Sequence, residues 1–331
     1  MVRMDSLVER FVPQLREALE IGKNAVIRPT GEEIRNVFLS GLGGSGIGGN
    51  FVQDFVREEL KIPFVVGKSY EIPAFVGAGT LAIASSYSGN TEETLSALDK
   101  MLTTGAGVVC VASGGKLIDI AKEKGLDYIK VPDNWPSPRA CLGYSIVQQL
   151  YILHKLGLIS ERATESINSA AMLLEVEADD IRKKASMIAE MLHGKTPVIY
   201  INDRMEAAAV RLRQQINENA KMLCWHHVIP EMNHNELVGW RTKNDNLAVI
   251  ILRNKNDHAR NQVRIDINKE IIGNYTNTLI EVYSKGSNLV EQMLYFVNLG
   301  DWISVYLAEL RKVDSIEVKV IDFLKDELAR Y

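Results

Sequence analysis

The 331-residue sequence contains little cysteine and no long apolar run. Its three cysteines, Cys110, Cys141 and Cys224, are far apart and odd in number, so we expect reduced, mostly packed thiols and no disulfide framework. No apolar stretch approaches the roughly 18 residues that a membrane-spanning helix needs. The sequence therefore predicts a protein without a membrane partner.

The sequence has no excess of positive charge, and we expect its first residues to form a helix and not a signal peptide. Leu7, Phe11, Leu15 and Leu19 recur every four residues with charges between them, which is typical of an amphipathic helix, so we expect a cytoplasmic protein. The net charge of -4 gives no general attraction to nucleic acid, and no nucleic-acid partner is expected. An anionic ligand must then be bound by local chemistry.

Short β-rich runs alternate with helical patterns along the chain, which is typical of βαβ units on a parallel sheet. The expected strands are residues 36–40, 63–66, 81–85, 107–112 and 128–131, and then 197–201, 222–228, 247–252 and 278–282. The length favours two domains, which we place at 1–158 and 159–331 with a cleft between them. We predict an α/β fold in which both domains are doubly wound, with parallel sheets flanked by helices.

Two loops in the first half carry the strongest functional signal. The first, SGLGGSGIGG (40–49), follows a predicted strand and leads into a helix expected to begin near Asn50. Its glycines, among them Gly44, allow the backbone to come close to an anion, and the helix start offers unpaired N–H groups. This loop therefore predicts an anion site.

The second loop, SSYSGNTEET (85–94), places the hydroxyls of Ser86, Ser88 and Thr91 at another helix start, where Asn90 and Glu93 have the spacing of a capping box. Hydroxyls donate hydrogen bonds to phosphate without carrying charge, and each bond to a charged group contributes about 1.5–3 kcal/mol. Together the two loops predict a phosphate site.

Two other interpretations compete with a phosphate site. Gly41, Gly43 and Gly46 fit the dinucleotide pattern G-x-G-x-x-G, but Lys68 stands where a ribose-binding carboxylate is expected. Alternatively, both loops are tight strand-to-helix turns with serine caps. Neither interpretation explains three hydroxyls directly after a buried strand.

The pair of GLGGSGIGG and SYSGNTEET resembles the sugar isomerase (SIS) domain. The segments NENAK (217–221) and PEMNHNELVGW (230–240) resemble, more specifically, the bifunctional phosphoglucose/phosphomannose isomerase family, and the similarity spans nearly the whole chain. The resemblance implies two SIS-type domains and a sugar-phosphate substrate. It also implies that the hydroxyl positions Ser45, Ser86, Ser88 and Thr91 bind the substrate phosphate.

Interconversion of an aldose and a ketose 6-phosphate moves a proton between C2 and C1 through an enediol, a task that suits a carboxylate. Glu218 ends a predicted helical run over 204–220. From spacing alone, an ion pair with Lys221 is an equally good explanation of Glu218. The resemblance implies that Glu218 is the catalytic base.

The resemblance implies three further catalytic groups. His234 matches a ring-opening histidine that comes from the neighbouring subunit in related isomerases, so a homodimer with shared active sites is expected. Lys325 in the last predicted helix is the preferred match to a lysine that assists ring opening, with Lys312 as the alternative. Arg139 resembles an arginine that stabilises the negative enediolate.

Other features limit what the resemblance implies. Ile316 and Val318 occupy a stretch where we would look for a threonine that sets tolerance for mannose 6-phosphate, so glucose activity is the firmer expectation. His226 and His227 are adjacent and have no clear ligand spacing, so we expect no metal and no other cofactor. The rival functions are an aminosugar-phosphate isomerase and a non-enzymatic sugar-phosphate sensor.

Overall fold

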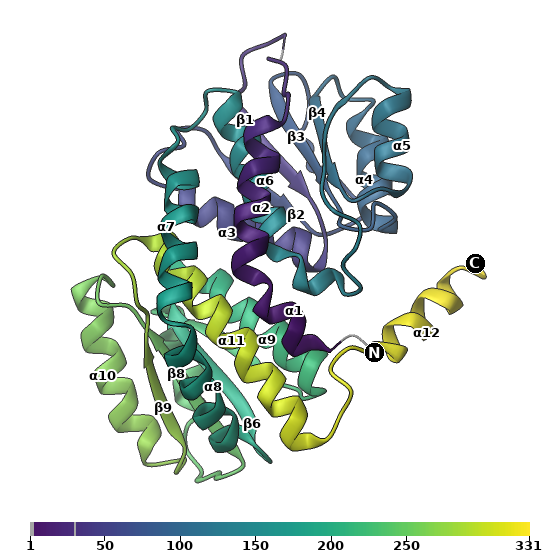
Figure 1. The fold of residues 1–331 in the computed structure, drawn as a ribbon. Coiled ribbons are helices and arrows are strands. Elements are labelled where there is room, and N and C mark those ends of the chain that lie inside the picture. Colours follow the sequence, from purple (N-terminus) through teal and green to yellow (C-terminus); the bar gives the residue numbers. More distant parts are fainter. Residues whose placement is uncertain (1–2, 30) are drawn as a thin grey trace. The chain divides into compact units, whose positions relative to one another are not determined.

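The computed structural model describes residues 3–29 and 31–331 (Figure 1). Its backbone contacts divide the chain into two compact units. The N-terminal unit comprises Arg10–Val176 with Gly286–Leu294, and the C-terminal unit comprises the chain up to Glu9, Glu177–Lys285 and Tyr295–Tyr331. The division of the chain into domains at residues 158 and 159 stays a prediction.

The N-terminal unit contains a five-stranded parallel sheet in the order β2-β1-β3-β4-β5. The five predicted strands are confirmed to within one or two residues at each end, since the runs that bury apolar side chains mark them clearly. The strands are β1 (Asn36–Ser40), β2 (Phe64–Gly67), β3 (Thr80–Ser85), β4 (Gly107–Ala112) and β5 (Asp127–Lys130).

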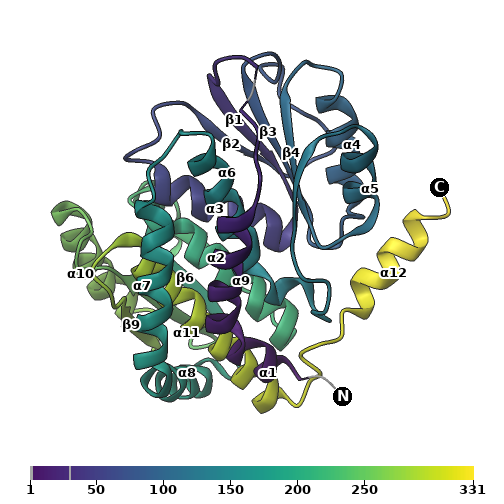
Figure 2. The ribbon, with the colours of Figure 1, turned by 45° about the horizontal axis from the view of Figure 1, so that its top comes forward.

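Helices cover both faces of this sheet (Figures 1 and 2). From β1 the chain winds toward one sheet edge and from β3 toward the other, so right-handed crossovers put α3 on the face opposite α4 and α5. The helices are α2 (Phe11–Asn24), α3 (Gly43–Val56), α4 (Glu92–Met101), α5 (Gly115–Glu123), α6 (Leu142–Lys155) and α7 (Arg162–Val176), with the short η1 (Pro138–Ala140). A buried apolar cluster between the sheet and the helices α4 and α5 includes Phe38, Leu98 and Ile118.

Two local predictions in this unit are wrong. Helix α3 begins at Gly43 and not near Asn50, so the glycine-rich segment itself forms its first two turns. Helix α4 begins after Thr91, and Asn90 does not cap it. Instead the Asn90 side chain accepts a hydrogen bond from the Lys116 backbone N–H (3.0 Å), a long-range contact that local spacing cannot reveal.

The C-terminal unit contains a four-stranded parallel sheet in the order β7-β6-β8-β9. The strands are β6 (Thr196–Asn202), β7 (Trp225–Ile229), β8 (Leu247–Arg253) and β9 (Leu279–Tyr283), and the helices are α1 (Met4–Glu9), α8 (Ala178–Leu192), α9 (Glu206–Ala220), α10 (Ala259–Gly273), α11 (Leu289–Arg311, shared with the other unit) and α12 (Lys319–Leu328). Right-handed crossovers place α9 and α10 on opposite faces of the sheet. The predicted α/β class with two parallel sheets is confirmed.

At the end of the chain, the spacing of Asp314 and Glu317 predicts a capping box before a last helix that runs to about Arg330, and the structure differs. Asp314 and Glu317 do not form a capping box for the last helix, because α12 begins at Lys319. Their carboxylates accept local hydrogen bonds from the backbone N–H groups of Ile316 (2.8 Å) and Lys319 (2.9 Å). None of the α12 residues is buried, and the helix projects away from the rest of its unit (Figures 1 and 2).

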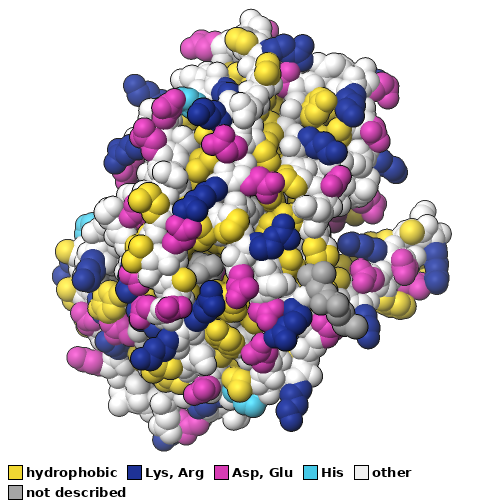
Figure 3. Space-filling view, viewed as in Figure 1, with side chains coloured by type: hydrophobic (Ala, Val, Ile, Leu, Met, Phe, Trp, Pro, Cys, Tyr) yellow, Lys and Arg dark blue, Asp and Glu magenta, His cyan; other side chains and the backbone are white. Residues whose placement is uncertain are grey.

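The surface carries charges of both signs, interspersed over the face shown in Figure 3. Cys110 and Cys141 are buried, and burial raises the pKa of the Cys110 thiol to about 12. Across residues 3–29 and 31–331, no helix combines the length and the apolar character that a bilayer span requires.

Candidate functional site

The two predicted phosphate loops leave neighbouring strands at the same edge of the N-terminal sheet. Strands β1 and β3 pair in parallel, with Ser40 beside Ala84, and the strand order reverses direction between them. In open α/β sheets such a switch point, at the carboxyl ends of the strands, is the preferred ligand site. The loops are in close contact there, because a Cβ atom added to Gly41 would lie 2.9 Å from the Ser85 carbonyl oxygen.

The loop after β3 brings two of the predicted hydroxyls together. The hydroxyl oxygens of Ser86 and Thr91 are 2.8 Å apart, and Ser86 Oγ also accepts a hydrogen bond from the Gly89 N–H (3.2 Å). Gly89 has a φ of +70°, and a Cβ atom there would overlap the Gly114 carbonyl, so the tight turn requires glycine. Ser88 is exposed, and its Oγ accepts from the Asn90 N–H (3.2 Å).

Both helices at this edge begin without a side-chain cap. The N-cap residues are Leu42 for α3 and Thr91 for α4, and neither side chain bonds the first backbone N–H groups of its helix. A phosphate oxygen can accept hydrogen bonds from such N–H groups, and the helix dipole favours its negative charge. Gly44 and Ser45 lie in the first turn of α3, which is the position that their predicted contacts with a phosphate require.

Helix α6 braces this first turn from behind. The Ser45 carbonyl accepts hydrogen bonds from Ser145 Oγ (3.3 Å) and Gln149 Nε2 (3.4 Å), and Gln149 also bonds Ser145 (2.8 Å). We did not predict this support from the sequence. The polar residues Ser145 and Gln149, four apart in a largely apolar helical pattern, were the available signal.

Arg139 lies near the same loop. It belongs to η1, and its side chain is buried, with 7% of the residue exposed. The neighbouring Pro138 carbonyl oxygen is 3.5 Å from the point where a Cβ atom of Gly44 would lie, so η1 packs against the start of α3. The structure therefore places Arg139 and the glycine-rich loop in one region of the N-terminal unit.

Glu218 lies in the last turn of α9, as predicted, and is half-buried. The helix ends at Ala220 and is followed by the C-cap residue Lys221, whose φ of 54° is left-handed. The Lys221 ammonium group donates hydrogen bonds to the backbone carbonyls of Glu218 (2.6 Å) and Glu317 (2.8 Å). Lys221 therefore connects the end of α9 to the segment that leads into α12.

A buried polar network fixes α9 against α11. Arg211 makes two hydrogen bonds to the Asp301 carboxylate, at 3.1 and 2.9 Å, and both side chains are at least 95% buried. Asn219, next to Glu218, donates to Ser304 Oγ (2.9 Å). These contacts fix the position of α9, the helix that carries Glu218, against α11.

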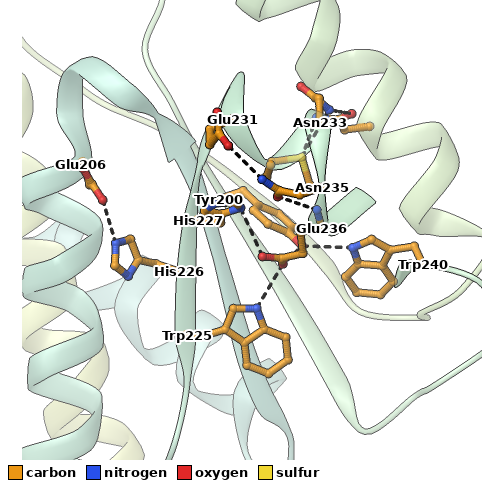
Figure 4. Close-up of polar contacts among 12 residues, drawn as sticks. Tyr200, Glu206, Trp225, His226, His227, Glu231, Asn233, Asn235, Glu236 and Trp240 are labelled. Atoms are coloured by element: carbon orange, nitrogen blue, oxygen red, sulfur yellow. Dashed lines mark hydrogen bonds and ion pairs between the residues drawn. The ribbon is translucent and has the colours of Figure 1, made fainter. Parts of the chain in front are cut away.

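His234 ends the short helix η3 (Glu231–His234), which follows β7, and its side chain is exposed. Figure 4 shows the polar contacts around this segment, in which Glu236 meets side chains from β6 and β7. Lys325 is exposed on α12, and Lys312 is exposed just after α11. Glu218, His234 and Lys325 thus come from three separate elements of the C-terminal unit.

The two histidines of β7 have carboxylate neighbours. His226 Nε2 lies 3.2 Å from Glu206 Oε1, and His227 Nδ1 lies 3.3 Å from Glu236 Oε2. Within the part of the chain that the structure describes, His, Cys, Asp and Glu side chains form no group of three or more that could hold a metal ion.

Comparison with known proteins identifies the family. A bifunctional phosphoglucose/phosphomannose isomerase from Caldicellulosiruptor bescii is 40% identical over 326 residues, covering 96% of each chain. The chain belongs to this family. A family model described as the bacterial phospho-glucose isomerase C-terminal SIS domain matches residues 181–328. The predicted resemblance is therefore confirmed, and it extends over nearly the whole chain.

More distant relatives show how widely this architecture is used. A D-glucosamine-6-phosphate 4-epimerase from Sulfolobus acidocaldarius is 28% identical, covering 86% of this chain and 89% of the epimerase. The solved C-terminal domain of glucosamine-fructose-6-phosphate aminotransferase from Francisella tularensis has a TM-score of 0.75 at 12% identity, covering 95% of this chain and 98% of that one. The solved structure supports the SIS-type fold of this chain.

Proposed function

We propose that this chain is an isomerase that interconverts glucose 6-phosphate, and also mannose 6-phosphate, with fructose 6-phosphate through an enediol intermediate. The observation that carries the proposal is the pair of glycine- and hydroxyl-rich loops that meet at the switch point between β1 and β3. Family membership supports the same substrate class. A sugar-phosphate sensor would need the loops but not Glu218 and His234.

The phosphate is proposed to bind Gly44, Ser45, Ser86, Ser88 and Thr91, with backbone N–H groups of α3 and α4 as further donors. The uncapped helix starts support this role, because an anion can satisfy N–H groups that no side chain caps. Arg139, buried beside the start of α3, is proposed to stabilise the negative charge of the enediolate.

Glu218 is proposed to move the proton between C2 and C1. Its place in the last turn of a firmly anchored helix suits a base, since a fixed carboxylate can reach two adjacent carbons without losing its orientation. His234 and Lys325 are proposed to assist ring opening, with Lys312 as the alternative to Lys325. The exposure of His234 and Lys325 fits active sites that are shared between two subunits of a homodimer. We also propose that the protein acts in the cytoplasm.

The decisive experiment incubates chelator-treated protein in D₂O with fructose 6-phosphate and identifies the products by NMR. We expect glucose 6-phosphate and mannose 6-phosphate with deuterium at C2 in part of each product, because the proton taken up by the base can exchange with solvent before it is delivered to C2. We also expect full activity without added metal. Glucosamine 6-phosphate in a parallel reaction should stay unchanged. Partial labelling fits Glu218 returning the same proton in some turnovers, whereas aldose products that gain no deuterium even after many rounds of interconversion would contradict proton transfer through an exchangeable base.

Glu218→Gln tests the assignment of the base. We expect kcat to fall by roughly 100-fold or more, the usual contribution of a general base. Glu190→Gln, at an exposed position of α8 in the same unit, is the matched control and should retain parental activity. If Glu218→Gln stays within a few-fold of the parent, another residue is the base.

A further inference from the structure

Glu236 lies two residues after His234, in the short loop 231–239 between β7 and β8, and its carboxylate is bonded to the sheet. Its Oε1 atom accepts hydrogen bonds from the Tyr200 hydroxyl (2.5 Å) and from the Trp225 indole N–H (3.1 Å), as Figure 4 shows. Tyr200 belongs to β6 and Trp225 to β7. One oxygen atom therefore attaches the loop to two neighbouring strands.

The hydrogen-bond chain around Glu236 continues on both sides. The Trp240 indole N–H donates to the Tyr200 hydroxyl (3.0 Å), and Tyr200 is 1% exposed. His227 Nδ1 lies 3.3 Å from Oε2, the other carboxylate oxygen of Glu236. Burial, and next the Glu236 carboxylate, raise the pKa of Tyr200, so its hydroxyl stays protonated and donates at every ordinary pH.

The other side of His234 is fixed as well. Met232 is fully buried, and the Asn233 side chain donates to Asn268 Oδ1 on α10 (2.7 Å). Within the loop, Asn235 Nδ2 donates to Glu231 Oε1 (2.9 Å). His234 is thus an exposed side chain on a backbone that is held from both directions, and mainly its own side-chain rotations remain.

We propose that Glu236 is a positioning residue for His234: it fixes the loop 231–239 against β6 and β7 so that the His234 imidazole is presented in one orientation. This inference rests on the proposed function, in which His234 assists ring opening. Glu236 acts through the loop because its Oε1 atom accepts hydrogen bonds from Tyr200 and Trp225, while His227 Nδ1 lies 3.3 Å from its Oε2 atom. A preset imidazole loses less rotational freedom when it engages the sugar ring.

The test compares kcat and KM for glucose 6-phosphate in a set of variants. Glu236→Ala should lower kcat by roughly 10- to 100-fold, as expected for a catalytic group displaced by about 1 Å, and should leave the inhibition constant of the open-chain sorbitol 6-phosphate within about two-fold of the parent. Glu236→Gln should recover most of the activity, because the amide oxygen can accept from Tyr200 and Trp225 while its NH₂ group faces His227 Nδ1.

A double-mutant cycle with His234→Ala shows whether Glu236 acts through His234. In the His234→Ala background, Glu236→Ala should cause little further loss. Trp225→Phe removes one hydrogen-bond donor to Glu236 at an exposed position. It should also lower kcat, by a smaller factor than Glu236→Ala does. Glu206→Ala, which removes the partner of His226 outside the loop, is the matched control and should keep parental kcat.

The outcomes separate the two proposals. If the parent protein does not isomerise glucose 6-phosphate, the proposed function fails and this inference fails with it. If the parent is active, losses that multiply in the double variant, or a Glu236→Gln variant as inactive as Glu236→Ala, overturn the positioning role. Should Glu236→Ala not fold, the same cycle run with Trp225→Phe decides, since equal losses in both backgrounds would exclude coupling to His234.

Discussion

Ser86 shows how a single hydroxyl can have two roles in the phosphate loop. It holds the turn by accepting from the Gly89 N–H, and it meets Thr91 Oγ1 at 2.8 Å. We predict that Ser86→Ala raises KM for fructose 6-phosphate by roughly 10- to 100-fold, the effect of losing one hydrogen bond to a dianion. Steady-state kinetics measure this change.

The control for Ser86→Ala is Ser166→Ala, which removes a serine hydroxyl bonded within α7 of the same unit (Ser166 Oγ to the Arg162 carbonyl, 2.8 Å). Its KM should equal that of the parent. A Ser86→Ala variant with unchanged KM would remove this hydroxyl from the phosphate site.

Asp257 makes the stability of the C-terminal unit depend on pH. Burial, and to a smaller extent Asp203, raise the pKa of its carboxyl from 3.8 to about 6, although an N–H from Asn254 and the charge of Arg253 oppose the shift. The folded state therefore holds more protons than the unfolded state between these values. The Asp257 contribution to the free energy of unfolding should then decline as pH rises from about 4 to about 6.

Asp257→Asn should remove this dependence, because an amide does not titrate. Between pH 4 and pH 7, we expect the free energy of unfolding of the variant to rise by about 1–2 kcal/mol relative to that of the parent. This energy allows for solvent screening of a partly exposed carboxyl group. Urea unfolding of both proteins at several pH values measures the difference. A difference that stays constant with pH would contradict the shifted pKa.

Among the helices, α9 depends on a buried charge pair for its attachment to α11. Asp301→Ala would leave Arg211 charged and without its carboxylate in the interior, so we predict a loss of about 3–5 kcal/mol in the free energy of unfolding. The double variant Arg211→Met, Asp301→Leu should regain most of that loss, since apolar side chains of similar volume need no ionic partner.

Denaturant unfolding of the single and double variants tests the role of the pair in α9. Equal losses in both variants would mean that packing, rather than the unpaired charge, causes the destabilisation. Because Glu218 lies in the last turn of α9, kcat of the folded double variant also shows whether the pair is needed to orient the base.

At the scale of the whole molecule, the proposed sharing of active sites between two subunits predicts how inactive variants behave when they are mixed. If each active site takes Glu218 from one subunit and His234 from the other, two inactive variants should complement each other. A mixed dimer of Glu218→Gln and His234→Ala then has one site with both native residues. After free subunit exchange in an equal mixture, about one quarter of parental activity should return.

The control for complementation mixes Glu218→Gln with the double variant Glu218→Gln, His234→Ala, a mixture that has no native base and should stay inactive. Activity against mixing ratio, together with the mass of the assembly in solution, measures the effect. Absence of any recovery despite demonstrated subunit exchange would place both residues of each site in one subunit.

The sequence by itself determined the α/β class, the approximate limits of the nine described strands and the two loops with their chemistry. These features depend on local periodicity and on residue type, as β1 and β4 show, which were predicted with their observed ends. The family also followed from the sequence, because its motifs lie in short continuous segments around Glu218 and His234. The role of each predicted site residue stays a prediction.

Only the tertiary structure decided which segments meet. The adjacency of β1 and β3 brings the two loops together, and the binding of Asn90 to the Lys116 backbone N–H replaces the predicted cap. The attachment of Glu236 to Tyr200 and Trp225 was likewise invisible to local reasoning. Strand order and side-chain partners are set by packing between residues distant in the chain, and a local pattern does not contain that information.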